Sequence, residues 1–351
     1  FGWISFLVAA IVYLMTIEPT VSFWDCGEFI TTSFKLQVGH PPGAPFFMII
    51  GRFFTLFGGG PENAAVMVNI MSALASAFTI LFLFWTITHL AKKLVSNDEP
   101  TTGQTVSIIA AGLVGALAYT FSDTFWFSAV EGEVYATSSL LTAIVFWAIL
   151  KWENVADEPY ANRWLILISY IMGLSIGVHL LNLLAIPAIV FVYYFRKYTT
   201  TRKGIVGALA VSVLLLALVM YGIIPGVFTI GSWFELLFVN SFRLPYHSGL
   251  LFYIAAIIAA IVFGIYYTTK KKLVLWNTVI VAVTVILLGY SSFALIIIRS
   301  SAKPPMDQNS PNNVFGMLAY LNREQYGDRP LVKGQYYNSP LVAREQYVHD
   351  K

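Results

Sequence analysis

Long apolar runs separated by short polar turns dominate the sequence. The runs lie at about 1–17, 64–90, 106–121, 135–150, 164–195, 204–223, 249–268 and 273–298. Most have the roughly 20 residues that a helix needs to cross a bilayer. The 164–195 run is long enough for two crossings, and the polar break "GVHLLN" at 177–182 allows the chain to turn back within it. The pattern therefore predicts about nine transmembrane helices.

Basic residues gather in alternate turns between these runs. With a cytoplasmic N-terminus, eleven Lys and Arg residues fall on the cytoplasmic side and three on the outer side before residue 299. The inner set is Lys92, Lys93, Lys151, Arg163, Arg196, Lys197, Arg202, Lys203, Lys270, Lys271 and Lys272; the outer set is Lys35, Arg52 and Arg243. This asymmetry satisfies the positive-inside rule. We therefore predict a multi-pass protein whose N-terminus is cytoplasmic.

Composition supports the same fold class and excludes others. Of the 351 residues, 58% are hydrophobic and 11% charged, against about 25% charged residues in soluble domains. The sequence thus predicts an all-α polytopic membrane protein. The single cysteine, Cys26, excludes an internal disulfide, and no Cys/His cluster has the spacing of a zinc site. The net charge of +3 resides largely in the turns, which argues against nucleic-acid binding.

The first outer loop, residues 18–63, concentrates polar chemistry beside the membrane. In "SFWDCGEFITTSFKLQVGHPPGAP" (22–45), Asp25 and Glu28 are three residues apart. They fit either a capping box, in which Glu28 reaches back to the helix start, or a functional carboxylate pair. The prolines after His40 predict a rigid turn that holds its side chain near the same surface, although it could simply bond to backbone. The apolar stretch 44–57 is short and carries Arg52, which indicates an interfacial or re-entrant helix.

Further polar groups lie at the ends of later spans. Glu131 and Glu133 precede the fourth span, and we expect Glu131 to be solvated and Glu133 to lie nearer the membrane. His179 and Asn182 sit at the break in the 164–195 run, where polar groups either serve function or satisfy open backbone. Arg243 and His247 share an outer loop, "SFRLPYHSG".

The polar segment 299–351 follows the last span and is predicted to be extracytoplasmic. This divides the chain into a transmembrane domain, 1–298, and a polar tail. In the tail, Ser310 is a candidate N-cap, Pro311 suits the first helical position and Gly327 a helix stop, which predicts one short helix.

Several segments resemble one bacterial membrane family. The most specific is "WDCGEFITTSFKLQVGHPPGAPFFMIIGRFFTLF" (24–57), which resembles the first-loop signature of a family related to the vertebrate transmembrane O-mannosyltransferase, in glycosyltransferase family 117 with the GT-C architecture. "EGEVYATSSLL" (131–141), "GLSIGVHLLNLLAIP" (173–187) and "RSSAKPPMDQNSPNNVFGMLAYLNREQYGD" (299–328) support the resemblance, which covers essentially the whole chain.

The resemblance implies an enzyme of the bacterial cytoplasmic (inner) membrane with a GT-C-like bundle. It would transfer a sugar, with mannose implied, from a polyprenyl-phosphate donor to a Ser or Thr hydroxyl of an acceptor protein on the outer side. No nucleotide and no cofactor are required by such chemistry, while a divalent metal stays possible. Family members often carry a further soluble region, so residues 299–351 are expected to begin one.

Roles for individual residues follow from the resemblance and from the chemistry of glycosyl transfer. The acidic position of the first loop matches Asp25, which we assign as general base, with Glu28 orienting it or the sugar. The leaving phosphate needs cations; the candidates on the outer side are Arg52, Arg243, His247 and Arg299. Arg52 could instead reach toward lipid headgroups, and Arg243 and His247 could belong to an ordinary loop. His40, Glu133, His179 and Asn182 are candidate substrate contacts.

Two other functions stay open at this point. A transporter or lipid flippase could use the outer carboxylates for ion coupling, although no internal repeat is evident and the acids lie at span ends rather than at mid-membrane. A non-catalytic assembly subunit could use the outer loops as docking surfaces.

Overall fold

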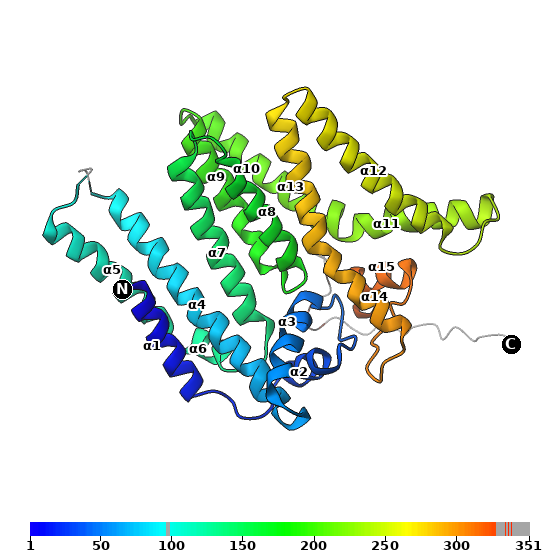
Figure 1. Ribbon diagram of the computed structural model, residues 1–351, viewed down its shortest axis with the longest axis horizontal. Helices are drawn as coiled ribbons and strands as arrows, with labels where there is room; N and C mark the ends of the chain where they lie inside the picture. The colour runs from blue at the N-terminus through cyan, green and yellow to red at the C-terminus, as the bar shows by residue number, and fades with distance from the viewer. Residues whose placement is uncertain (96–98, 328–333, 335, 337, 339–351) are drawn as a thin grey trace.

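A computed structural model describes residues 1–95 and 99–327, together with residues 334, 336 and 338. In this part of the chain the fold is helical, and its one β-type pairing is an isolated bridge between Val38 and Asp307 (Figure 1). The α-helices are α1 (Gly2–Met15), α2 (Cys26–Lys35), α3 (Pro45–Thr55), α4 (Ala64–Lys93), α5 (Thr102–Thr120), α6 (Asp123–Ala129), α7 (Val134–Val155), α8 (Asn162–Ile176), α9 (Ile186–Lys197), α10 (Arg202–Ala217), α11 (Ile224–Leu236), α12 (Ser248–Lys270), α13 (Val274–Tyr290), α14 (Ala294–Ser301) and α15 (Val314–Asn322).

Seven helical segments are long and apolar enough to cross a membrane. They are Pro61–Lys93, Thr102–Thr120, Val134–Val155, Leu180–Lys197, Arg202–Ser241, Ser248–Lys270 and Val274–Ser301. The other two predicted crossings form the shorter apolar helices α1 and α8, of 14 and 15 residues. The protein is thus a multi-pass membrane protein with seven long candidate spans, while nine crossings stay a prediction.

The basic turns and the first loop lie at opposite ends of the bundle. The C-terminal end of α4 and the turns α7–α8, α9–α10 and α12–α13 lie toward the upper end in Figure 1, whereas α2, α3 and α14 lie toward the lower end. The predicted break at 177–182 is present: α8 ends at Ile176, and a 3₁₀ turn, η3 (Leu180–Ala185), leads into α9. The predicted short helix within 44–57 is α3, extended by the turn η1 (Leu56–Gly58).

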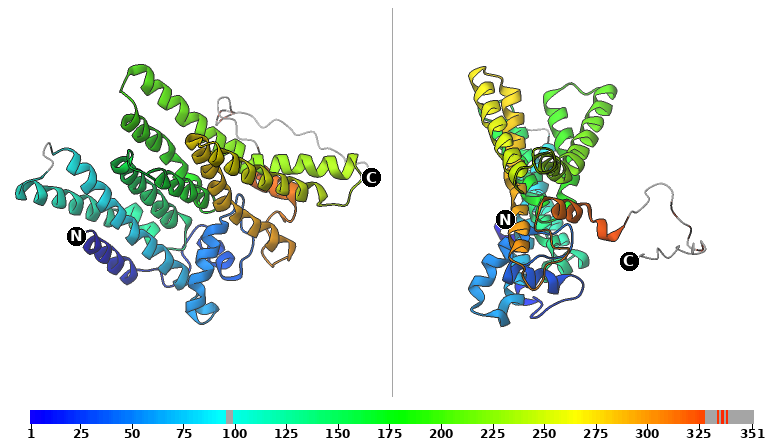
Figure 2. Two further views of the ribbon diagram at one scale, coloured as in Figure 1. Left: turned by 45° about the horizontal axis from the view of Figure 1, so that its top comes forward. Right: turned by 90° about the vertical axis from the view of Figure 1, so that its right-hand side faces the viewer.

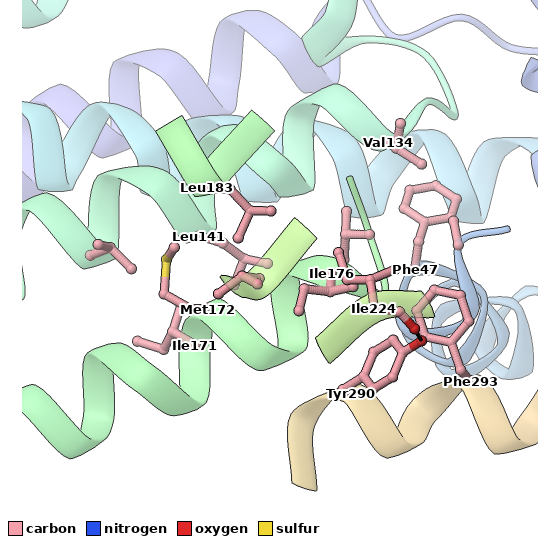
Figure 3. Packing of buried hydrophobic residues seen from close by; sticks show 14 of the residues in the cluster. Phe47, Val134, Leu141, Ile171, Met172, Ile176, Leu183, Ile224, Tyr290 and Phe293 are labelled. Atoms are coloured by element: carbon pink, nitrogen blue, oxygen red, sulfur yellow. Dashed lines mark hydrogen bonds between the residues drawn. The ribbon is translucent and has the colours of Figure 1, made fainter. Parts of the chain in front are cut away.

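A buried apolar cluster joins the spans to the first loop. Phe47 of α3 lies near Ile176, Tyr290 and Phe293 of the surrounding helices (Figure 3). The Tyr290 hydroxyl donates to the Ile224 carbonyl at 2.6 Å, which satisfies a polar atom inside this cluster. The first loop is therefore packed into the bundle rather than lying free on its surface.

The segment after α10 departs from the predicted boundary. The apolar run was expected to end at 223, but the helix continues through a π-helical stretch, η4 (Leu218–Ile223), into α11 and η5 (Leu237–Ser241). Pro225 lacks an amide hydrogen, and its ring clashes with the preceding turn of a regular helix, so the wider turn just before it accommodates the proline. Helix α11 runs nearly across the bundle and packs against α15 (Figures 1 and 2).

Candidate functional site

Asp25 and Glu28 frame the start of α2, but they do not form the predicted capping box. Asp25 occupies the N-cap position without a side-chain hydrogen bond to the helix amides, and its side chain is exposed. Glu28 does not reach back to the helix start, because its carboxylate is bonded to His40 and to Gln308 of the tail. The capping interpretation is therefore wrong, and the Asp25 carboxylate is left open.

Glu28 and His40 form a compact ion pair. Glu28 Oε1 accepts from the His40 backbone amide at 2.6 Å and from His40 Nδ1 at 2.8 Å, while Oε2 accepts from Gln308 Nε2 at 3.0 Å. Burial alone would raise the pKa of the Glu28 carboxyl, but the hydrogen bonds from His40 outweigh burial and hold this pKa below its usual value. The same hydrogen bond raises the pKa of His40. The pair therefore favours an anionic Glu28 and a cationic His40.

The tail is hydrogen-bonded to the first loop. The Val38 amide donates to the Met306 carbonyl, and Gln308 donates back to the Val38 carbonyl. The Tyr320 hydroxyl donates to the Gly39 carbonyl at 2.6 Å. The described part of the predicted tail, 299–327, is thus docked on the first loop; residues 328–333, 335, 337 and 339–351 lie outside the described residues.

The tail contains the predicted short helix, but its N-cap differs. α15 begins at Val314, and Asn313 caps it by accepting from the amides of Phe315 and Gly316. Ser310 has a left-handed backbone, with φ of 44°, and lies one residue before Pro311, outside the helix. An asparagine three residues further on supplied the better-placed acceptor.

A cavity of about 440 Å³ lies between the first loop, the start of α7, the break before η3 and the end of α15. Four predicted residues line it together: Asp25, His40, Glu133 and His179. Arg323 of the tail also lines it, a role that no sequence pattern indicated. Arg323 ends α15 in a left-handed conformation, with φ of 56°, a common feature of helix ends that carries no functional signal by itself.

Both glutamates before α7 are buried. Burial, together with the nearby negative charges of Asp25 and Glu131, raises the pKa of Glu133 to about 7. Glu133 accepts from the Val134 amide at 3.3 Å and lines the cavity. Glu131 was expected to be solvated, which is wrong: it is 4% exposed, and burial raises its pKa. The first loop and its neighbours cover this turn, which the sequence alone did not reveal.

His179 and Asn182 share the break but differ in environment. His179 Nδ1 accepts from the Leu181 amide at 3.1 Å, and burial lowers the pKa of its ring. A neutral ring whose Nδ1 accepts must carry its proton on Nε2, which is then a hydrogen-bond donor. Asn182 is fully buried, and its amide has no hydrogen-bond partner within the described part of the chain. It therefore does not satisfy open backbone, the alternative considered from sequence.

The four predicted phosphate-binding cations lie elsewhere. Arg52 donates to the Phe34 carbonyl at 2.7 Å, and Arg299 donates to the Leu36 carbonyl at 2.6 Å, so both guanidinium groups bind the C-terminal end of α2. Positive charge at this position is favourable because the last carbonyls of a helix are unpaired and carry partial negative charge. Arg243 and His247 are exposed in the loop before α12, and neither lines the cavity.

The match to known proteins begins at Asp25. The family described as Protein O-mannosyl-transferase TMEM260 N-terminal domain matches residues 25–202, about half of the chain. The chain belongs to this family. The TMEM260 N-terminal domain thus includes the α2–α3 loop, Glu133 and the break at His179, whereas Arg323 and the docked tail lie beyond the matched region.

Two curated relatives of the TMEM260 N-terminal domain family are similar to this chain. Protein O-mannosyl-transferase tmem260 of Dictyostelium discoideum is 26% identical over 196 residues, which is 54% of this chain and 22% of that protein. Protein O-mannosyl-transferase TMEM260 of Mus musculus is 26% identical over 172 residues, 49% of this chain and 22% of that protein. The chain therefore aligns with about a fifth of the length of each relative. No solved structure matches it.

A separate, apolar groove lies further along α7 than the Asp25 cavity. It has a volume of about 530 Å³ and lies between α4, α5 and α7. On α7, Tyr135 lines the cavity, whereas Ser139, Thr142 and Phe146, which follow along the helix, line the groove. Leu180 lines the cavity and Leu181 the groove. The groove thus lies further along α7 than the polar cavity, toward the middle of the bundle.

Two threonine side chains of the groove are satisfied within their own helices. Thr79 donates to the Ala75 carbonyl at 3.0 Å, and Thr142 donates to the Ser138 carbonyl at 2.9 Å. The groove therefore presents a largely apolar surface to a ligand. Across the described residues, no group of three or more His, Cys, Asp or Glu side chains is placed to hold a metal ion.

Proposed function

We propose that this chain is the membrane part of a glycosyltransferase that moves mannose from a polyprenyl-phosphate donor to a Ser or Thr hydroxyl of an acceptor protein. Family membership and the printed names of the two relatives support this class of reaction. The cavity lies at the end of the bundle opposite the basic turns. Because the positive-inside rule assigns the basic turns to the cytoplasmic side, the cavity then faces the outer side of the inner membrane.

One observation carries the proposal: an open carboxylate and two cationic groups line the same cavity. Asp25 is exposed and caps no helix amide, while His40 and Arg323 lie on the wall of that cavity. Transfer from a lipid phosphate needs a base for the attacking hydroxyl and positive charge for the departing phosphate. A guanidinium and a protonated imidazole both suit phosphate oxygens.

The chemistry assigned to these groups is a single displacement. The acceptor oxygen attacks the anomeric carbon while its proton moves to the Asp25 carboxylate. The bond between that carbon and the phosphate oxygen breaks, and polyprenyl phosphate leaves with the bonding electrons, stabilised by His40 and Arg323. Because attack occurs on the face opposite the phosphate, the anomeric centre inverts. Glu28 acts through His40, holding the ring in place and charged.

The remaining polar groups of the cavity suit sugar hydroxyls. Glu133, with a pKa of about 7, can donate a hydrogen bond when protonated and accept one when ionised. The His179 ring, which lies beside Tyr135 at the start of α7, supplies an Nε2–H donor. These assignments make both residues donor-binding groups rather than bases.

The apolar groove beside the cavity fits the polyprenyl tail. A donor of this kind has an anionic head and a long apolar chain, and a largely apolar groove between spans lies further along α7 than the cation-lined cavity. The head would lie between the first loop and Arg323, with the tail along α7. Burial of the tail in this groove contributes to donor affinity roughly in proportion to its apolar area.

Asp25→Asn tests the proposal directly. Purified protein in proteoliposomes is supplied with mannosyl phosphoryl polyprenol and an acceptor peptide, and transferred mannose is measured by mass spectrometry. We expect the transfer rate to fall by at least about 100-fold, as for loss of a general base, while donor binding persists. Asp123→Asn is the matched control, since Asp123 is an exposed acid near the same end that does not line the cavity.

Two results of this experiment would overturn different parts of the proposal. Unchanged transfer by the Asp25 variant would overturn the base assignment, and absence of transfer by the unmodified chain with intact donor binding would overturn the proposed reaction.

A further inference from the structure

We propose that the basic end of the bundle holds a specific site for the phosphate headgroup of an anionic phospholipid. A cavity of about 410 Å³ lies there between α4, α5 and α7. Its wall includes Trp85, His89 and Lys92 of α4 together with Trp147 and Lys151 of α7. This cavity shares no lining residue with the Asp25 cavity, which lies at the start of α7, whereas Trp147 and Lys151 lie toward the other end of that helix.

Two ammonium groups are available in this cavity. Lys92 and Lys151 have no carboxylate within ion-pair distance among residues 1–95 and 99–327. Glu153, the acid one turn from this wall, is paired with Lys93. Lys151 lies over the Trp147 ring, 5.4 Å from its centroid, a contact that helps to hold its ammonium group at the cavity. Two cations without partners in one concave site attract an anion.

A buried imidazole nitrogen adds a directional partner. His89 Nε2 is excluded from solvent and has no hydrogen-bond partner within the described chain. A buried polar atom without a partner is costly, and a phosphate oxygen in the cavity would supply one. Both kinds of contact, charge and hydrogen bond, therefore point to the same chemical group.

The position of the cavity identifies a lipid rather than a soluble anion. Lys92 lies in the last turn of α4 and Lys151 lies close before the last turn of α7, near the level where headgroups meet hydrocarbon. Trp85 and Trp147 pack against each other, with centroids 5.9 Å apart, as expected of aromatic residues at a membrane interface. The adjoining helix α5 has little of its span buried within the protein, which leaves apolar surface beside the site for acyl chains.

Competitive lipid binding tests the site. The full chain in mild detergent is titrated with equal amounts of phosphatidylglycerol and phosphatidylcholine, and bound lipids are counted by native mass spectrometry. We expect the unmodified chain to prefer phosphatidylglycerol and the Lys92→Gln/Lys151→Gln variant to lose about thirtyfold in that preference. The Lys92→Arg/Lys151→Arg variant should retain the preference, which shows that a variant at these positions can fold and bind.

The matched control is Lys270→Gln/Lys271→Gln, which removes the same charge from the same end of the bundle but outside the cavity. Equal lipid preference in the Lys92/Lys151 and control variants would overturn the site. Displacement of phosphatidylglycerol by excess inorganic phosphate would overturn its assignment to a lipid. This result is independent of mannose transfer, so it stands or falls separately from the proposed reaction.

Discussion

Replacing Glu28 by glutamine tests the clamp, the set of hydrogen bonds by which Glu28 joins His40 of the first loop to Gln308 of the tail. The carboxylate accepts three hydrogen bonds, two from His40 and one from Gln308. Glutamine keeps one acceptor oxygen and turns the other into a donor that faces a donor. The pair is shielded, with side-chain exposures of 27% for His40 and 18% for Glu28. Because hydrogen bonds to charged groups contribute about 1.5–3 kcal/mol each, we expect a loss of about 2–4 kcal/mol in the free energy of unfolding.

The effect should depend on pH in a defined direction. The lowered pKa of Glu28 gives stability that is present above its ordinary value of 4.5 and is lost as pH falls. The raised pKa of His40 gives stability that is fully present below its ordinary value of 6.5 and is lost as pH rises through the folded-state pKa. The difference between the unmodified chain and Glu28→Gln should therefore be largest between pH 4.5 and 6.5.

Thermal unfolding in detergent, followed by tryptophan fluorescence, measures this difference. A loss of 2–4 kcal/mol corresponds to a Tm lower by about 4–10 °C. Glu62→Gln is the control, because Glu62 is an exposed glutamate of the same loop that forms no ion pair among the described residues. If the two variants unfold at the same temperature across this pH range, the clamp contributes nothing and the reasoning fails.

Three further predictions concern the groove, the cavity and a turn. Ala143→Phe should narrow the apolar groove and raise the KM for a full-length polyprenyl donor about tenfold, which is equivalent to losing the burial of about two methylene groups. The KM for a short-chain donor should not change. As a control, Thr284→Phe, in the separate groove between α12 and α13, should leave the KM of both donors unchanged. Donor affinity should fall as pH rises through about 7, because Glu133 then becomes anionic in the cavity that holds the anionic donor. Glu133→Gln should weaken this dependence, and a pH profile unaltered by this substitution would contradict the assignment. Gly43→Ala should lower stability by more than about 1 kcal/mol, because φ is +79° and the new Cβ would lie 2.6 Å from Ile296 Cδ1. Gly59→Ala, at φ +74° in open space, isolates the backbone cost, and equal Tm values for the two variants would exclude the steric contribution.

Sequence alone determined the helical plan of this protein. The apolar runs, the polar break at 177–182 and the short helix α3 could be predicted from local sequence, because a helix in lipid satisfies its backbone within its own segment. The gathering of basic turns at one end followed from the same plan. The ends of the spans were predicted less accurately: the run expected to end at 223 continues as helix past Pro225, because a π-helical stretch accommodates the proline.

The tertiary structure decided which side chains meet. Asp25, His40, Glu133 and His179 were found as separate candidates, but only packing placed them around one cavity and brought Arg323 to it from the tail. Packing also placed Glu28 within hydrogen-bond distance of His40, and it placed the guanidinium groups of Arg52 and Arg299 at the C-terminal end of α2. The physical reason is the sequence separation of the interacting groups. Backbone hydrogen bonds in a helix join residues close in sequence, whereas the partner of a charged side chain often lies on a segment that is distant in sequence and brought close by hydrophobic burial.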